Sequence, residues 1–209
     1  MTHDPNGTPP GGVLERLTAS LGAEGARRGP PPVERWNPDY CGEIPMRIAA
    51  DGTWHYNGSP ITRPALVRLF STILRRDPDG RTVLVTPVER VGIEVEDAAF
   101  LAVEMAVEGE GEARAIAFRT NLDDVVPLDD AHPLRFERDP EGGFKPYVAV
   151  RHGLWARLTR ALAYDLVELC EEREEAGETW FGLPAGGRFH RIARSSELGS
   201  GEFGAAEPS

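Results

Sequence analysis

The feature that most constrains the fold is a pair of runs, 91–96 and 101–108, in which apolar and polar residues alternate. Val91, Ile93 and Val95 alternate with glycine and glutamate in the first run. Leucine, valine and methionine alternate with alanine and glutamate in the second. A period of two is typical of a strand with one face on a core and the other in water. We therefore predict two consecutive half-buried strands, joined by a turn between the runs.

A hairpin and a helix are predicted upstream of these strands. Asp51-Gly52 is a favourable hairpin turn, and it separates Met46–Ile48 from Trp54–Tyr56. By alternation, Trp54 and Tyr56 share one face of the hairpin. The helix is predicted from a single apolar stripe at helical spacing. Its members are Leu66, Leu69, Phe70, Ile73 and Leu74.

The same order of elements is predicted again downstream. Leu134–Glu137 and Phe144–Val150 are expected to form a second hairpin, and a second helix is expected from about Leu154 to Arg173. Two short strands, Thr179–Phe181 and Arg188–Ile192, follow it. Strands outnumber helices and short turns join them, which favours an α+β fold of two repeated motifs. In this prediction, antiparallel sheets are each packed with one main helix.

Four segments are predicted along the chain. Residues 1–35 are rich in proline and glycine and are expected to be mostly disordered, apart from one short amphipathic helix. Residues 36–130 form the first α+β unit and residues 131–196 the second. Residues 197–209 are rich in glycine and serine and are expected to be a flexible tail.

Composition bounds the partners. The chain has 209 residues and a formal charge of −11. That balance argues against nucleic-acid binding and against docking on an anionic membrane, because both need clustered positive charge. Cys41 and Cys170 do not suggest a disulfide framework, and neither a membrane span nor a secretory signal is evident. We therefore expect a cytoplasmic protein.

Several motifs together carry a family resemblance. They are Cys41–Met46, Asp51–Pro64, Val83–Arg90, Val95–Phe100, Phe118–Asn121 and Pro146–Arg160. In this order they resemble a proteobacterial family known as domain-of-unknown-function family 1285, over about Trp36 to Ile192. The resemblance implies a fold of repeated α+β motifs and a role in ligand sensing or signal transduction. It implies no catalytic residues, because none is established for the family.

Most catalytic chemistries lack their motifs. The five histidines are scattered, without the recurrent spacings of a zinc site, so no metal is predicted. No G-x-S-x-G or phosphate-binding glycine motif occurs, so no cofactor is predicted either. Cys170 lies among glutamates that would raise its pKa, which is unfavourable for a nucleophile.

A binding site is predicted where polar residues follow strands. Arg90, Arg119 and Arg151 are positioned to hold an anionic small ligand if the strand ends converge. Trp54 and Tyr56 would then supply an apolar wall. The nominated ligand-binding residues are Trp54, Tyr56, Thr86, Glu89, Arg90, Asp97, Arg119, Asn121 and Arg151. The competing interpretation is that each arginine pairs with a neighbouring carboxylate.

Three functions follow from these patterns. The favoured one is a regulatory module that binds a small ligand or a protein, without chemistry of its own. The second is a hydrolase that uses a carboxylate and histidine set drawn from His55, Glu89, Glu96 and Asp97. The third is a structural interaction module, with residues 1–35 as the partner-binding element.

Overall fold

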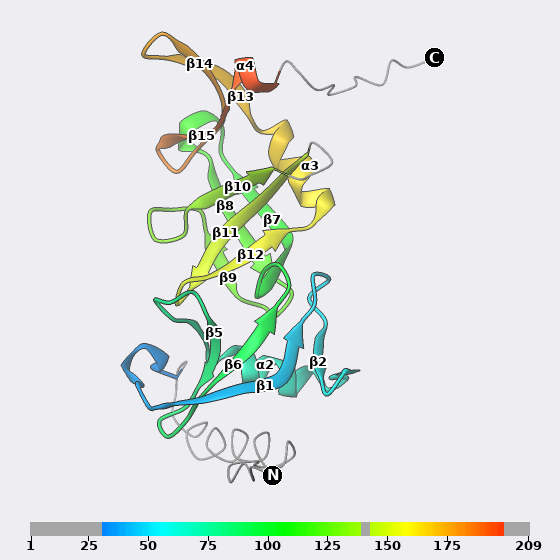
Figure 1. The fold of residues 1–209 in the computed structure, drawn as a ribbon. Coiled ribbons are helices and arrows are strands. Elements are labelled where there is room, and N and C mark those ends of the chain that lie inside the picture. The colour runs from blue at the N-terminus through cyan, green and yellow to red at the C-terminus, as the bar shows by residue number, and fades with distance from the viewer. Residues whose placement is uncertain (1–30, 139–142, 199–209) are drawn as a thin grey trace, which may run out of the picture. The chain divides into compact units, whose positions relative to one another are not determined.

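A computed structural model describes residues 31–138 and 143–198. Most of these residues lie in strands, so the fold is α+β with a large excess of β-structure (Figure 1). The chain divides into two compact units. The first comprises the described residues up to Ala99 together with Arg151–Leu154, and the second comprises Phe100–Val150 and the described residues from Trp155 onward.

The first unit contains a six-stranded sheet and one main helix, α2 (Pro64–Ser71). The strands are β1 (Tyr40–Ile48), β2 (Trp54–Tyr56), β3 (Ser59–Pro60), β4 (Leu74–Arg76), β5 (Thr82–Val85) and β6 (Arg90–Val95). A short 3-10 helix, η1 (Val33–Arg35), precedes them. The sheet order is β3-β2-β1-β6-β5-β4. Its central pair, β1 and β6, is parallel, and the other pairs are antiparallel.

The predicted hairpin and the predicted helix are both present in this unit. Met46 pairs with Tyr56 and Ile48 pairs with Trp54 across the Asp51-Gly52 turn. Trp54 and Phe70 are buried, and their rings stack with centroids 6.5 Å apart. The helix ends at Ser71, so Leu74 of the predicted stripe begins a strand instead.

The second unit repeats the strand topology of the first. Its strands are β7 (Phe100–Glu108), β8 (Ala115–Thr120), β9 (Val125–Pro127), β10 (Leu134–Arg138), β11 (Phe144–Arg151) and β12 (Leu154–Leu158), with η2 (Gly111–Ala113) after β7. The sheet order is β10-β11-β12-β7-β8-β9, and the first and last strands, β7 and β12, again form a parallel central pair. In both units six consecutive strands therefore follow one path, and the sheets are mixed rather than antiparallel as predicted.

Three further strands follow the second repeat. After helix α3 (Arg160–Glu168), strands β13 (Glu171–Glu175), β14 (Glu178–Ala185) and β15 (Arg188–Arg194) form a separate antiparallel sheet, and α4 (Ser195–Leu198) ends the described chain. The repeat thus lies in the strands. The helices differ in position, because α2 lies between the third and fourth strands of its unit and α3 follows the sixth of the other.

The predicted long helix over 154–173 is wrong. Leu154, Ala156 and Leu158 are buried and alternate with less buried residues, so this part is strand β12. The helix begins only after Thr159, whose hydroxyl accepts a hydrogen bond from Leu162 N. Apolar residues at 154, 155 and 158 satisfy both a period of two and a period near four, and pairing with β7 decides between them.

The units divide at Ala99, whereas the predicted units divide at residue 130. Strands β8 and β9 pair in the sheet that begins with β7, which places residues 115–127 in the second unit. The described order begins before Trp36, because Val33 is fully buried. The predicted amphipathic helix within residues 1–30 and most of the predicted tail lie outside the described residues.

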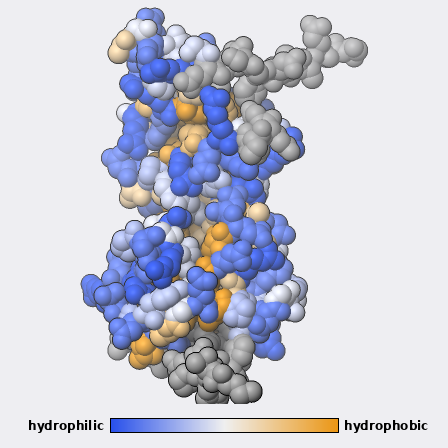
Figure 2. Space-filling view, viewed as in Figure 1, coloured by the Kyte–Doolittle hydropathy of each residue, from blue (hydrophilic) through white to orange (hydrophobic). Residues whose placement is uncertain are grey.

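Apolar side chains on the surface are few and scattered. The face shown in Figure 2 is mostly hydrophilic, and the large exposed apolar residues of the described ranges are Val88, Val107, Val125 and Tyr164. Among the described residues, no helix has the length and apolar character needed to cross a membrane.

Candidate functional site

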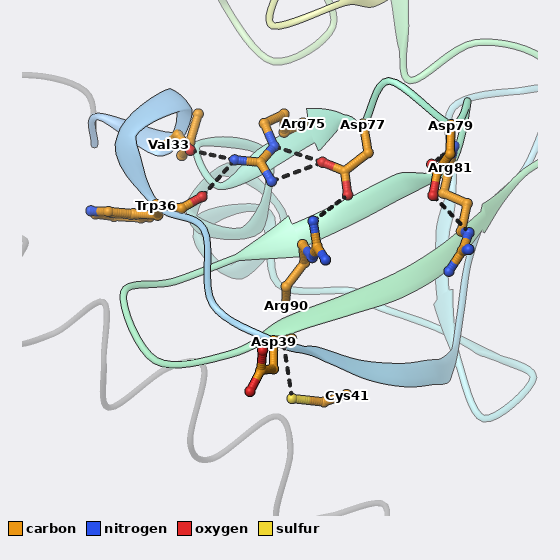
Figure 3. A network of polar contacts seen from close by, with 9 residues as sticks. All are labelled: Val33, Trp36, Asp39, Cys41, Arg75, Asp77, Asp79, Arg81 and Arg90. Carbon is orange, nitrogen blue, oxygen red and sulfur yellow. Dashed lines mark hydrogen bonds and ion pairs between the residues drawn. The ribbon is translucent and has the colours of Figure 1, made fainter.

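The most connected polar cluster of the first unit is centred on Asp77, in the turn after β4 (Figure 3). Arg75 donates to one Asp77 carboxylate oxygen from Nε at 2.8 Å, and Arg90 donates to the other from Nη1 at 3.0 Å. The Asp77 side chain is 6% exposed, so solvent screens these ion pairs little. One buried carboxylate therefore holds two arginines from different strands.

Arg75 also fastens the start of the described chain to the sheet. Its Nη1 donates to Val33 O at 2.8 Å and to Trp36 O at 2.7 Å, across 42 and 39 positions of sequence. A guanidinium can make these bonds and bind a carboxylate at once, because its N–H groups form a rigid planar fork. A lysine cannot reproduce that geometry.

Arg90 is less completely engaged than Arg75. Among the described residues, Nη1–Asp77 is its one hydrogen bond, its buried Nε has no acceptor, and its side chain remains 23% exposed. Its guanidinium carbon lies 5.9 Å from the centroid of the Tyr40 ring. Arg90 therefore retains hydrogen-bonding capacity at the edge of the cluster.

A second arginine flanks the same ring. The Arg81 guanidinium carbon is 4.7 Å from the Tyr40 centroid, and its side chain is half exposed beside Asp79. A hydrogen bond with Tyr40, followed by the charge of Asp79, raises the pKa of Arg81. Tyr40 lies against Gly92, where a Cβ would meet the phenol oxygen at 2.5 Å. Glycine at this position thus leaves the space that the ring occupies.

The nominated loop after β5 is a locally closed turn. The Thr86 hydroxyl accepts hydrogen bonds from Val88 N at 3.4 Å and Glu89 N at 3.1 Å, and Thr86 N donates to Glu89 O at 2.9 Å. Thr86 and Glu89 are buried, while Val88 is 73% exposed. Of the three nominated residues of this loop, only Arg90 reaches the Asp77 cluster.

The arginines nominated outside this loop have structural partners within their own units. In the second unit, Arg119 pairs with Glu104 on β7 and with Asp123 in the turn after β8. Its hydrogen bond to Glu104 raises the pKa of Arg119 and lowers that of the carboxyl. Arg151, assigned to the first unit, donates to Ser71 O at 2.9 Å. The interpretation that arginines pair internally describes Arg119 well.

The remaining nominated residues are placed as follows. The Asn121 amide oxygen accepts a hydrogen bond from Leu101 N at 3.0 Å, which ties the end of β8 to β7. Trp54 is buried against Phe70, and Tyr56 is half-buried at the end of β2. Asp97 lies half-buried between β6 and β7. These contacts account for structure and do not assemble a wall around Arg90.

The proposed carboxylate and histidine set is divided by β6. Glu89 directly precedes this strand and Glu96 directly follows it, a separation of roughly 20 Å at about 3.3 Å per residue. Glu96 pairs with Arg47 through one oxygen and accepts from Ala50 N at 2.8 Å through the other. A general acid and base must reach one substrate, so this set does not assemble a single catalytic centre.

Two other chemistries are constrained by the described residues. Within residues 31–138 and 143–198, no three His, Cys, Asp or Glu residues are grouped so as to hold a metal ion. Burial raises the pKa of the Cys170 thiol to about 12, and the nearby charge of Arg114 only partly offsets this. The predicted direction of this shift is confirmed, but its cause is burial and not the neighbouring glutamates.

Sequence reasoning missed the centre of the cluster. Asp77 was read only as part of a helix-ending turn, and neither Arg75 nor Tyr40 was nominated. The available signal was an aspartate directly after two arginines within an apolar context. That pattern does not show that the carboxylate is buried, nor that Arg90 reaches it.

Comparisons with known proteins place this geometry in a family. The model of the N-terminal domain of DUF1285, a domain of unknown function, matches residues 31–98, and that of the C-terminal domain matches residues 99–192. No curated protein matches the chain. A crystal structure of a DUF1285 family protein from Silicibacter pomeroyi DSS-3 is similar, with a TM-score of 0.75 and 46% identity over 86% of this chain and 97% of that one. Another, from Shewanella baltica OS155, has a TM-score of 0.48 and 27% identity over 60% of this chain and 91% of that one.

Proposed function

The chain belongs to the DUF1285 family, whose function is unknown, and from that premise we propose that it is a regulatory module that binds a small anionic ligand. In this proposal the ligand is a carboxylate or phosphate compound. It binds in the first unit beside Tyr40, between Arg81 and Arg90, and undergoes no reaction there.

The observation that supports the proposal is the incomplete engagement of Arg90. A partly buried guanidinium with an N–H that lacks an acceptor costs about 1 to 3 kcal/mol, and Arg90 has such a group. Arg81 supplies a second cation within 6 Å of the same ring centroid. Two guanidinium groups on one aromatic ring are suited to bind an oxyanion, through hydrogen bonds and charge together.

Two further observations favour binding over catalysis at this cluster. Asp77 is held by two arginines and is not positioned as a base for an incoming substrate. Glu89 and Glu96 lie at opposite ends of β6. A binding role therefore uses groups that remain available, whereas the hydrolase hypothesis needs groups that the strand keeps apart.

A thermal-shift screen with phosphate, sulfate, small dicarboxylates and nucleoside phosphates tests the proposal. A ligand that binds the native state raises the unfolding midpoint by mass action. We expect Arg81→Gln to weaken the affinity of the best anion by roughly tenfold or more, since a charge-assisted hydrogen bond is lost. Arg119→Gln is the matched control, because Arg119 is an exposed arginine already paired within the second unit.

Equal affinities for Arg81→Gln, Arg119→Gln and the wild type would place the anion elsewhere. The absence of a midpoint shift with every anion would refute the proposed class of ligand. Titration calorimetry on the same three proteins separates specific binding from a general effect of salt, because the control variant has the same net charge as Arg81→Gln.

A further inference from the structure

The edges of the three sheets differ in how they are protected against pairing with another chain. β3 ends with Pro60 and β9 ends with Pro127. The following residues, Ile61 and Leu128, donate their N–H groups inward, to Trp54 O and Ile116 O. Because inward and outward groups alternate along an antiparallel strand, both proline nitrogens face outward, where they offer no donor.

Three other edges carry different obstacles. At β4, Arg76 N donates to His152 O at 3.0 Å, so part of that edge is occupied. β13 contains four glutamates, a concentration of like charge that disfavours pairing with a second copy of itself. β15 is basic, and its pairing with β14 is irregular between Phe181 and Gly182, as at a β-bulge. Each of these features is a known way to block an edge.

β10 is the remaining edge, and its outward groups are unblocked. It is the last strand in the order of the second sheet. Ala149 N donates to Pro133 O at 3.0 Å, and the register continues with Leu134 opposite Val148. By the same alternation, Arg135 and Glu137 bond inward to β11, while Leu134, Phe136 and Arg138 direct their N–H and C=O groups outward.

We infer that a second copy of this chain pairs with β10 in antiparallel orientation, about a two-fold axis at Phe136. In this register Phe136 lies opposite Phe136 of the second copy, and Leu134 lies opposite Arg138. All of these positions direct backbone groups outward, so each pair exchanges two hydrogen bonds. The described strand spans Leu134–Arg138, and Phe136 is the outward-facing centre that uses its whole length.

The charge pattern of β10 fits this partner. The same register places Arg135 of each copy opposite Glu137 of the other. Both side chains are exposed, 42% and 50%, and they form an ion pair at 3.1 Å within the strand. Unlike charges on directly opposed residues stabilise an antiparallel pair, and like charges oppose it. The strand is therefore complementary to itself when reversed, whereas the acidic β13 is not.

Apolar contact adds to the pairing. Phe136 and Leu134 are half-buried at the edge of the sheet, where Phe136 lies opposite Pro146 of β11. Pairing covers the remaining surface of both Phe136 rings, and aromatic pairs directly across strands are favourable. A single short strand pair is a small interface, so we expect a reversible dimer with a dissociation constant of roughly micromolar or weaker.

Sedimentation velocity of the full chain, from about ten micromolar to one millimolar, tests the inference over the range expected for a small interface. We expect the dimer fraction to rise with concentration in the wild type and to fall at least tenfold in association constant for Glu137→Arg. That change opposes two arginine pairs across the axis. The double variant Arg135→Glu with Glu137→Arg restores opposite charges and is expected to recover the dimer.

Two controls address folding and location. Phe136→Pro removes an outward donor while keeping the inward bonds to β11, so it should abolish the dimer with an unchanged circular dichroism spectrum. Glu172→Arg makes the same charge change on β13 and should leave association unchanged. A chain that is monomeric at every concentration overturns the inference. So does a dimer that neither Glu137→Arg nor Phe136→Pro weakens.

Discussion

Replacing Asp77 by alanine tests whether the buried carboxylate organises the first unit. The substitution leaves Arg75 and Arg90 without their shared acceptor, and their side chains are only 12% and 23% exposed. Removing one partner of a buried ion pair costs about 3 to 5 kcal/mol, and the partial exposure of Arg90 places the expected loss near the lower limit, about 3 kcal/mol. That is a large fraction of a typical free energy of unfolding.

Urea unfolding followed by tryptophan fluorescence measures this loss. Trp36 and Trp54 report on the first unit, while Trp155 and Trp180 belong to the second. For an m value of about 1 to 2 kcal/mol/M, the midpoint of the first unit falls by about 1.5 to 3 M. Far-UV circular dichroism on the same samples shows whether the native strands remain before the transition.

Asp79→Ala is the matched control, two residues away in the same turn. Asp79 pairs with Arg81, but both side chains are about half exposed, so solvent screens the pair and little stability depends on it. Asp77→Asn keeps an acceptor oxygen while removing the charge, and it should fall between the two alanine variants. Equal midpoints for Asp77→Ala and Asp79→Ala would refute the argument that burial of the carboxylate sets the effect.

Three further outcomes are expected. Gly92→Ala should destabilise the first unit by about 1 to 3 kcal/mol in the same urea assay, because the new methyl group overlaps the tyrosine ring that lies against it. Ala176→Asn should stabilise the chain by about 0.5 to 1 kcal/mol, since the residue has a φ of +54° in a two-residue hairpin turn that favours Asn-Gly, and Asn57→Ala in the equivalent turn should have the opposite effect. In thiol labelling at pH 8, Cys41 is expected to react and Cys170 to stay unmodified until the chain unfolds, because Cys170 is buried with a raised pKa; equal rates in the native state would contradict this.

The strands of the alternating runs are predictable from sequence because their signal is local. Each of 91–96 and 101–108 contains its own period of two, and the structure has β6 and β7 there. The first hairpin is equally local, since Asp51-Gly52 is a turn by its own conformational preferences. The segment 154–158 failed because its apolar spacing fits two periods, and only the partner strand β7 selects one.

The arrangement of the sheets is not local. The parallel pairing of β1 with β6, and of β7 with β12, joins strands separated by the rest of their unit. A parallel pair requires a long crossover and leaves no turn signature between its strands. The repeat was therefore predictable as an order of elements, but its boundaries and its mixed sheets were not.

The candidate site shows the same division. Arg90 was nominated because polar residues often follow strands at functional loops, and it does lie in the polar cluster. Its carboxylate partner, Asp77, lies 13 positions away, and the backbone acceptors of Arg75 lie about 40 positions away. A long flexible side chain can meet many acceptors, so residue type alone does not select among them.

By itself, the sequence determined where this chain forms strands and tight turns, because side-chain alternation and the backbone preferences of Asp-Gly and Asn-Gly act over a few residues. Only the tertiary structure decided which arginines are engaged and which strand edge stays open. Burial and backbone direction depend on neighbours that are brought together from distant parts of the chain.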